Sequence, residues 1–194
     1  MKMDSTQLTI HNLEGTTLTR MFGRPTLRNV NKTRNEITAA YAQNKTKHPG
    51  FPSGERFGFA AAIMKQKRFI TLHNETEQPG EDGWLDEEWE FEYPSRPSAY
   101  DSTINGQMLD ATRRRKEEER KALLEGWDTF NAYELAYKTK LAAAYDEPYW
   151  ATLKHDIFGF SHLTVQQMIE HLERQCLALT NREKKQKLKD TQLP

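Results

Sequence analysis

The fold is decided by residues 123–176, which read LLEGWDTFNAYELAYKTKLAAAYDEPYWATLKHDIFGFSHLTVQQMIEHLERQC. In the first part of this stretch, apolar side chains recur at three-, four- and seven-residue steps, at Leu123, Trp127, Phe130, Tyr137, Leu141 and Ala144. This spacing places them along one side of a helix, with most of the charged residues off that side. A helix with one apolar face needs a partner that covers it.

The partner is expected directly downstream. Residues 146–148, Asp-Glu-Pro, end or bend the first helix. Gly159 allows a second reversal, and Thr164 with Gln167 fits the capping box that begins another helix. Between and after these breaks lie two further apolar sets, one at Tyr149, Trp150, Leu153, Ile157 and Phe158, the other at Val165, Met168, Ile169, Leu172 and Cys176. Three helices joined by short turns would form a small helical core.

The predicted fold class is therefore all-α, a small bundle of roughly five helices with an irregular N-terminal arm and an acidic loop. Each fully buried large side chain contributes roughly 1.5–3 kcal/mol to such a core. The residues assigned to the core and its turns are Trp127, Phe130, Tyr137, Leu141, Pro148, Tyr149, Trp150, Leu153, Met168 and Leu172.

Composition limits the class of protein. Of 194 residues, 36% are hydrophobic and 29% charged, which indicates a modest core with exposed arms. The net charge is zero, but residues 20–68 hold eleven Lys and Arg against two Glu, whereas residues 75–101 hold ten Asp and Glu against one Arg. One cysteine excludes an internal disulfide and a multi-cysteine zinc site. Without a membrane-length apolar run or a secretory signal, we expect a soluble, cytoplasmic protein.

The chain is expected to divide into an arm over residues 1–24, a helical domain over 25–178 and a basic tail over 179–194. Within the domain, a helix should run from about Thr26 to Asn44, and the short apolar block from Phe59 to Met64 favours helix over strand. Gly54 and Gly58 just before that block do not form a nucleotide-binding loop, so close packing or a turn explains them better.

The acidic–aromatic segment, residues 75–103, interrupts the helical domain. Aromatic and Glu residues alternate at positions 89–93, which is typical of a strand, but flanking prolines also allow a loop laid over the core. Functionally, the segment could dock on the basic region 20–68, within one subunit or on a neighbour, or it could be a solvated excursion pinned by its tryptophans. The candidate residues for self-association or partner binding are Trp84, Glu87, Glu88, Trp89 and Glu90.

The sequence holds no recognisable catalytic constellation. None of the six histidines forms an H-E-x-x-H motif or a His/Cys zinc spacing, and there is no G-x-S-x-G elbow. We therefore expect no enzyme activity, no cofactor and no metal. Only a buried polar cluster around His155, Asp156 and His162 would revive an enzymatic interpretation.

The order of features in residues 141–176 resembles the Gag-type structural protein of copia-class LTR retroelements. An alanine-rich helix end, an Asp-x-Pro-aromatic turn, a Gly-aromatic turn and a Thr-capped helix ending in His-Leu are matched by Ala142 to Ala144, Asp146, Pro148, Tyr149, Gly159, Phe160, Thr164, His171 and Leu172. Upstream, HPGFPSGERFGFAAAIMKQKRFITL is similar to the family's Pro/Gly stretch before a small-apolar block.

The resemblance implies the first, helical part of a capsid-forming Gag, which packs against copies of itself and encloses element RNA. The chain would then be a fragment of a polyprotein or a domesticated remnant. The zinc knuckle that usually binds RNA in this family is absent, so RNA contact would come from Lys184, Lys185, Lys187 and Lys189. The alternative is a monomeric helical adaptor that recognises a partner through the acidic–aromatic segment.

Overall fold

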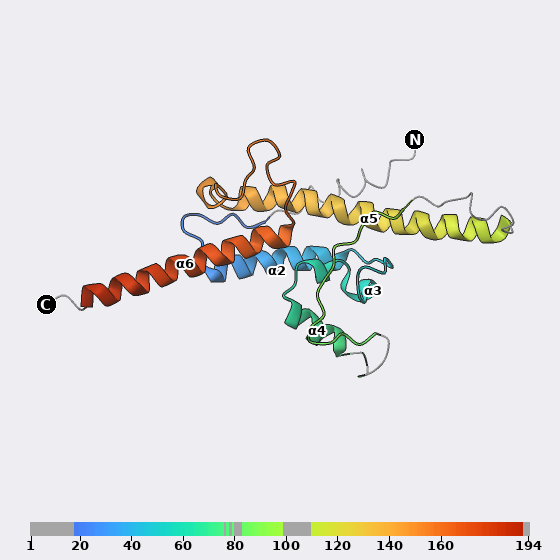
Figure 1. Cartoon of the computed structure of the whole chain (residues 1–194), viewed down its shortest axis with the longest axis horizontal. Helices are drawn as coiled ribbons and strands as arrows, with labels where there is room; N and C mark the ends of the chain where they lie inside the picture. The colour runs from blue at the N-terminus through green and yellow to red at the C-terminus, as the bar shows by residue number, and fades with distance from the viewer. Residues whose placement is uncertain (1–17, 76, 78, 80–82, 99–109, 192–194) are drawn as a thin grey trace. The chain divides into compact units, whose positions relative to one another are not determined.

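The computed structural model describes residues 18–75, 77, 79, 83–98 and 110–191, and within them it confirms the predicted all-α class (Figure 1). No β-strand occurs among these residues. The α-helices are α2 (Leu27–Gln43), α3 (Gly54–Phe57), α4 (Gln66–Asn74), α5 (Asp110–Ala144) and α6 (Val165–Thr191), and two 3₁₀ turns, η1 (Ala60–Ala62) and η2 (Glu147–Tyr149), lie between them. None of the described helices is both long and apolar enough to span a bilayer.

The starts of α2 and α6 follow from capping residues. Thr26 precedes α2, and its Oγ1 accepts a hydrogen bond from the Asn29 backbone N at 3.2 Å. At the start of α6 the capping box is reciprocal: the Gln167 N donates to Thr164 Oγ1 at 3.1 Å, and the Thr164 N donates to Gln167 Oε1 at 2.9 Å. The predicted helix from Thr26 to Asn44 and the Thr-capped helix are thus both present.

The prediction of a helix over the apolar set from Tyr149 to Phe158 is wrong. After η2 the chain makes turns, and an isolated bridge joins His155 to Gly159. The His155 imidazole accepts hydrogen bonds from the backbone N of Ile157 and of Phe158, and such side-chain acceptors compete with helix formation. Trp150 is buried, but Ile157 and Phe158 are 80% and 62% exposed.

The small-apolar block is helical, but only in part. Ala60–Ala62 form the buried 3₁₀ turn η1, and a separate helix, α4, begins at Gln66. The tight turn follows from Gly58, whose φ of +56° and ψ of −131° suit only glycine. A Cβ there would lie 2.5 Å from the carbonyl oxygens of Tyr41 and Asn44, so close packing accounts for this glycine as predicted.

The described residues form two compact units. Unit 1 comprises the described residues between 38 and 133, and unit 2 comprises residues 18–37 and 134–191, so the chain enters unit 2 twice. Helices α2 and α5 each supply residues to both units. Helix α6 runs through residue 178 without a break, so the backbone of the predicted basic tail continues that helix as far as Thr191.

The core of unit 1 is aromatic. The Phe51 ring lies 4.8 Å from the Phe59 ring and 4.9 Å from the Phe130 ring, centroid to centroid, and all three side chains are buried. The Tyr41 ring meets the Tyr133 ring edge-on at 5.5 Å. Edge-on and tilted contacts at these separations are the favoured arrangements for aromatic pairs, so residues 51–59 are held firmly against α5.

The core of unit 2 is built by α2, α5 and α6. Its buried apolar residues include Val30, Ile37, Tyr137, Leu141, Trp150, Val165, Met168, Ile169 and Leu172. Arg34 of α2 pairs with Glu173 of α6 at 3.0 Å, and Cys176 Sγ lies 3.3 Å from the Pro25 carbonyl oxygen. The single cysteine is therefore a buried packing residue, and burial raises the pKa of its thiol.

Several residues assigned to the core lie at its edge. Trp127, Tyr149 and Leu153 are half-buried, and Pro148 is exposed. Pro148 lies inside η2, where its fixed φ favours the turn, so its assignment to the core is corrected to a role in ending the helical path.

Candidate functional site

Large apolar side chains are exposed mainly on unit 2. Among the described residues, those that are exposed are Phe22, Leu27, Leu135, Ile157, Phe158 and Leu177 in unit 2, and Trp84 and Tyr93 in unit 1. Scattered single residues of this kind are ordinary on a protein surface. Ile157 and Phe158 differ because they are adjacent, and both stand out from the same turn. We call this pair the apolar tip.

The apolar tip is held by a dense set of hydrogen bonds. The backbone N and O of His155 and Gly159 bond reciprocally at 2.9 Å, which closes the turn. Inside it, His155 Nδ1 accepts from the Ile157 N at 3.1 Å and the Phe158 N at 3.3 Å. Gly159 has a φ of +55°, which glycine adopts without strain. The two apolar side chains are thus presented to solvent by an ordered backbone.

A pocket of about 480 Å³ lies at the base of the apolar tip. Its lining residues, all in unit 2, are Glu147, Pro148, Ala151, Lys154 and Asp156. Lys154 Nζ lies 3.4 Å from Glu147 Oε1, and Asp156 is exposed. The pocket therefore combines two small apolar walls with charges of both signs.

The polar residues whose burial would revive an enzymatic interpretation are not buried. His155, Asp156 and His162 are all exposed, although the two imidazole rings approach to 6.0 Å. Because His155 Nδ1 already accepts two backbone hydrogen bonds, this ring has a structural task in the turn. Across the described residues, no group of three or more His, Cys, Asp or Glu side chains is placed to hold a metal ion.

The acidic–aromatic segment is a loop laid over the core of unit 1, and the strand alternative is wrong for its described residues. The Trp89 ring stacks on Phe69 at 5.4 Å, Phe91 packs on Phe51 at 5.5 Å, and Tyr93 packs on Phe130 at 5.7 Å. Asn74 fixes the start of the loop, because its side-chain amide donates to the Leu85 O at 2.7 Å and accepts from the Leu85 N at 3.1 Å.

This placement separates the candidate strip residues into two kinds. Trp89 is half-buried and anchors the loop, and its carbonyl oxygen accepts a hydrogen bond from the Gln66 side chain. Trp84 is 37% exposed, and Glu87, Glu88 and Glu90 face solvent. The segment thus packs within one subunit through rings and amides, on Phe51 and Gln66 of the 20–68 region and on Phe69, Asn74 and Phe130 outside it, and leaves those three carboxylates accessible.

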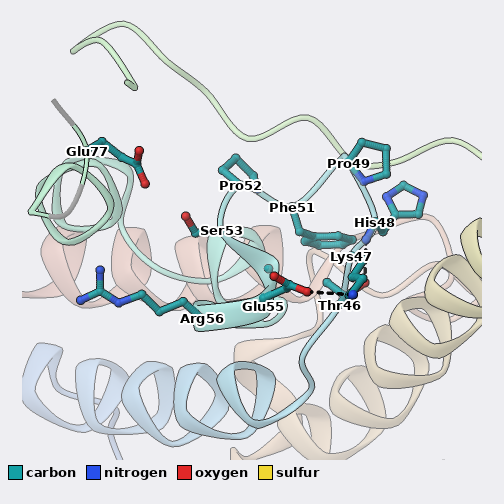
Figure 2. Close-up of a pocket in the computed structure, with 11 residues that line it drawn as sticks. Thr46, Lys47, His48, Pro49, Phe51, Pro52, Ser53, Glu55, Arg56 and Glu77 are labelled. Atoms are coloured by element: carbon teal, nitrogen blue, oxygen red, sulfur yellow. Dashed lines mark hydrogen bonds and ion pairs between the residues drawn. The ribbon is translucent and has the colours of Figure 1, made fainter. Parts of the chain in front are cut away.

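An open groove of about 790 Å³ lies in unit 1, and it was not predicted from the sequence. Figure 2 shows its lining, which consists of Thr46, Lys47, His48, Pro49, Phe51, Pro52, Ser53, Gly54, Glu55, Arg56 and Glu77. The Lys47–Glu55 ion pair, 3.2 Å long, lies along one side, and Glu77 faces the groove from the opposite side. The signal in the sequence is the Pro/Gly-rich stretch HPGFPSGE, which follows the helix predicted to end near Asn44.

His48 is the one buried ionisable side chain of this lining. Its Nδ1 accepts a hydrogen bond from the Gly50 N at 3.1 Å, and its ring packs edge-on against Phe51. Burial lowers the pKa of the imidazole, because the charged form loses its hydration. Burial therefore favours the neutral form of this ring, which is part of the turn that shapes the groove.

No family model, curated protein or solved structure matches this chain. The resemblance to copia-class Gag proteins consequently stays an expectation that rests on the residues quoted for it.

The basic residues expected to contact RNA belong to the last turns of α6. The backbone at Lys184, Lys185, Lys187 and Lys189 is helical, and the Lys185 side chain is exposed. The other three side chains lie outside the described set, so their arrangement stays a prediction.

Proposed function

We propose that this chain is a structural protein that assembles with copies of itself, as the Gag-type capsid proteins of LTR retroelements do, and that it works by assembly and not by catalysis. The proposal includes packaging of element RNA in the cytoplasm. The observation that carries it is the concentration of exposed large apolar side chains on unit 2, which holds six of the eight among the described residues, including the adjacent pair of the apolar tip.

These side chains lie outside the core of unit 2, whose own residues are buried without them. Tyr137 and Leu141 in α5, and Met168 and Leu172 in α6, are 1% exposed or less. Leu135, two residues before Tyr137, faces away from this core and is 67% exposed. Contact with another copy would remove such apolar surface from water, and each Å² so buried contributes about 25 cal/mol. The exposed apolar side chains therefore support the proposal that the outer surface of unit 2 binds other copies of the chain.

Sedimentation velocity over a hundredfold range of protein concentration tests the proposal. We expect the sedimentation coefficient of the wild-type chain to rise with concentration, and Leu135→Lys to weaken that rise. Thr139→Lys is the matched control. Thr139 is exposed one turn further along α5, and its substitution adds the same charge without removing an apolar side chain. A wild-type chain that stays monomeric across the range contradicts the proposal.

RNA packaging has a separate test in the salt dependence of binding. Replacing Lys184, Lys185, Lys187 and Lys189 with Gln should weaken binding to a single-stranded RNA oligonucleotide and reduce the slope of log K against log salt, because fewer counterions are released. The control replaces Arg113, Arg114 and Arg115, which belong to a helix segment rich in Glu. Equal slopes for the tail variant and the wild type would contradict the assignment of RNA contact to the tail.

A second candidate function is that of a monomeric adaptor, and the acidic–aromatic segment favours it. Trp84 is partly exposed beside Glu87 and Glu88 on a loop that is already ordered by its other aromatic residues. An adaptor would stay monomeric and bind a basic peptide. We expect Glu87→Lys with Glu88→Lys to abolish binding of an oligolysine probe in that case, whereas no change on this double substitution contradicts the adaptor.

A further inference from the structure

We infer that two copies of this chain bind through exchange of their apolar tips, each copy placing Phe158 and Ile157 in the pocket at the base of the other copy's tip. The inference rests on the proposed function, because it names the surface through which assembly begins. It depends on one juxtaposition: an ordered, exposed apolar pair next to a pocket that is lined by opposite charges.

The tip is prepared for binding before it meets a partner. The reciprocal His155–Gly159 bonds and the two bonds to His155 Nδ1 fix the backbone of the turn in the isolated chain. The His155 ring also lies 5.0 Å from the Phe158 ring, which restricts that side chain. Little conformational entropy is then lost on association, and this is a main cost that a flexible loop would have to meet.

The pocket and the tip belong to one continuous patch. Asp156 lines the pocket and directly precedes Ile157, the first residue of the tip. A twofold dimer requires a self-complementary patch, in which the residue that one copy inserts is received by the same patch on the other copy. An apolar tip beside a pocket with Pro148 and Ala151 as walls meets this requirement.

The charges around the pocket can pair across a twofold axis. Lys154 and Asp156 have opposite signs, stand on the same short segment and are both exposed, and Lys154 also lies 3.4 Å from Glu147 of its own chain. In a twofold pairing, Lys154 of one copy meets Asp156 of the other, and the same contact repeats across the axis. A second copy presents both members of this pair in matching places, so the charge arrangement favours a second copy as the occupant.

The contact is small, and its size sets the expected strength. Two side chains and one pocket per copy bury less surface than the roughly 1,200 Å² of a stable interface. Tip exchange alone should therefore be weak, and it becomes effective when other surfaces of unit 2 bind at the same time and raise the effective concentration.

Charge reversal with complementation tests the inference. Lys154→Asp alone places carboxylates opposite each other twice, and Asp156→Lys alone does the same with ammonium groups. We expect each variant to weaken the dimer about tenfold, because two exposed ion pairs become repulsive. An equimolar mixture of the two variants should recover wild-type association in sedimentation velocity, because every contact across the axis is then attractive.

The turn itself provides a second test. Phe158→Ser removes the inserted ring and should weaken association at least as much as charge reversal, while the midpoint of urea unfolding stays at the wild-type value. His155→Ala removes the acceptor that orders the tip and should weaken association. His155→Asn should restore it, because an Asn side chain at the start of a turn also accepts backbone N–H bonds from the following residues.

The outcomes separate this inference from the proposed function. If the wild type assembles with concentration but both charge variants assemble equally well, tip exchange is overturned and assembly stands. If the mixture of the charge variants stays as weak as each alone, the twofold arrangement is overturned. If the wild type binds phosphatidylcholine vesicles through Phe158 and does not self-associate, the tip serves a lipid surface, and both the exchange and the assembly proposal fail.

Discussion

Two irregular segments of this chain contain aromatic residues, and they use them in opposite ways. In unit 1 the acidic–aromatic segment turns Trp89, Phe91 and Tyr93 onto the rings beneath it. In unit 2 the segment after η2 buries Trp150 but turns Ile157 and Phe158 into solvent. One loop thus completes a core, whereas the other presents an apolar surface that a partner can cover.

Whether an aromatic residue in a loop is buried or exposed depends on what lies beneath the loop. The first loop crosses an existing aromatic cluster, so its rings gain contacts and become structural. The second loop is closed by hydrogen bonds of its own, through His155 and Gly159, and so its side chains are not required to pack.

The largest effect should come from the phenylalanine beneath the first loop. Phe51 is buried and contacts rings from the loop, from α5 and from its own segment, so Phe51→Ala should lower the free energy of unfolding by about 3–5 kcal/mol. Phe158→Ala removes the same atoms from an exposed site and should change it by less than about 0.5 kcal/mol. Urea denaturation measures both, and equal losses would remove the distinction between the loops.

Two glycines with nearly the same φ provide the next effect. At Gly58 an added Cβ would meet backbone oxygens at 2.5 Å, so Gly58→Ala should cost about 3 kcal/mol or more. At Gly159, φ is nearly the same but no atom lies within 4 Å of the added Cβ, so Gly159→Ala should cost only about 1–2 kcal/mol. Thermal or urea unfolding of the pair tests this, and a larger loss at Gly159 would contradict it.

The anchoring of the acidic–aromatic segment provides a smaller effect. Trp89→Ala removes the stack on Phe69 and should cost about 1–3 kcal/mol, and it should also expose the segment to proteolysis. A Glu-specific protease measures this, because Glu87, Glu88 and Glu90 lie in the same segment. Trp84→Ala is the control, since its exposed ring anchors less. Unchanged cleavage rates in Trp89→Ala would contradict the anchoring role.

The smallest effect should be the pH dependence caused by His48. Burial lowers its pKa in the folded chain below the ordinary value of about 6.5, so the unfolded chain binds the proton more readily. The contribution of the neutral, buried imidazole to the free energy of unfolding is therefore fully present above about pH 6.5, and it is lost as the pH falls from there through the lowered pKa of the folded chain. Urea unfolding from pH 7.5 to 5 measures the loss. His48→Asn should reduce it, whereas the exposed His162→Asn should leave it unchanged.

Much of the fold could be predicted because helices carry their own signals. The heptad spacing in 123–144, the capping box at Thr164 and the helix after Pro25 all depend on neighbours within a few residues, and all are present. The prediction of a second helix was wrong. It rested on the helical spacing of Ile157 and Phe158 from the apolar residues before them, and spacing does not reveal that the His155 imidazole accepts their amide hydrogens. The groove around His48 was missed because it forms where the HPGFPSGE turn meets distant residues such as Glu77.

The sequence by itself determined that this chain is helical and where most helices begin, because propensity, capping and periodicity are local properties. It also determined that no disulfide can form within the chain. Only the tertiary structure decided which aromatic residues are covered and which remain exposed, because burial depends on what lies opposite in space. Trp89 and Phe158 are both aromatic residues of irregular segments, but Trp89 packs on Phe69 whereas Phe158 faces water.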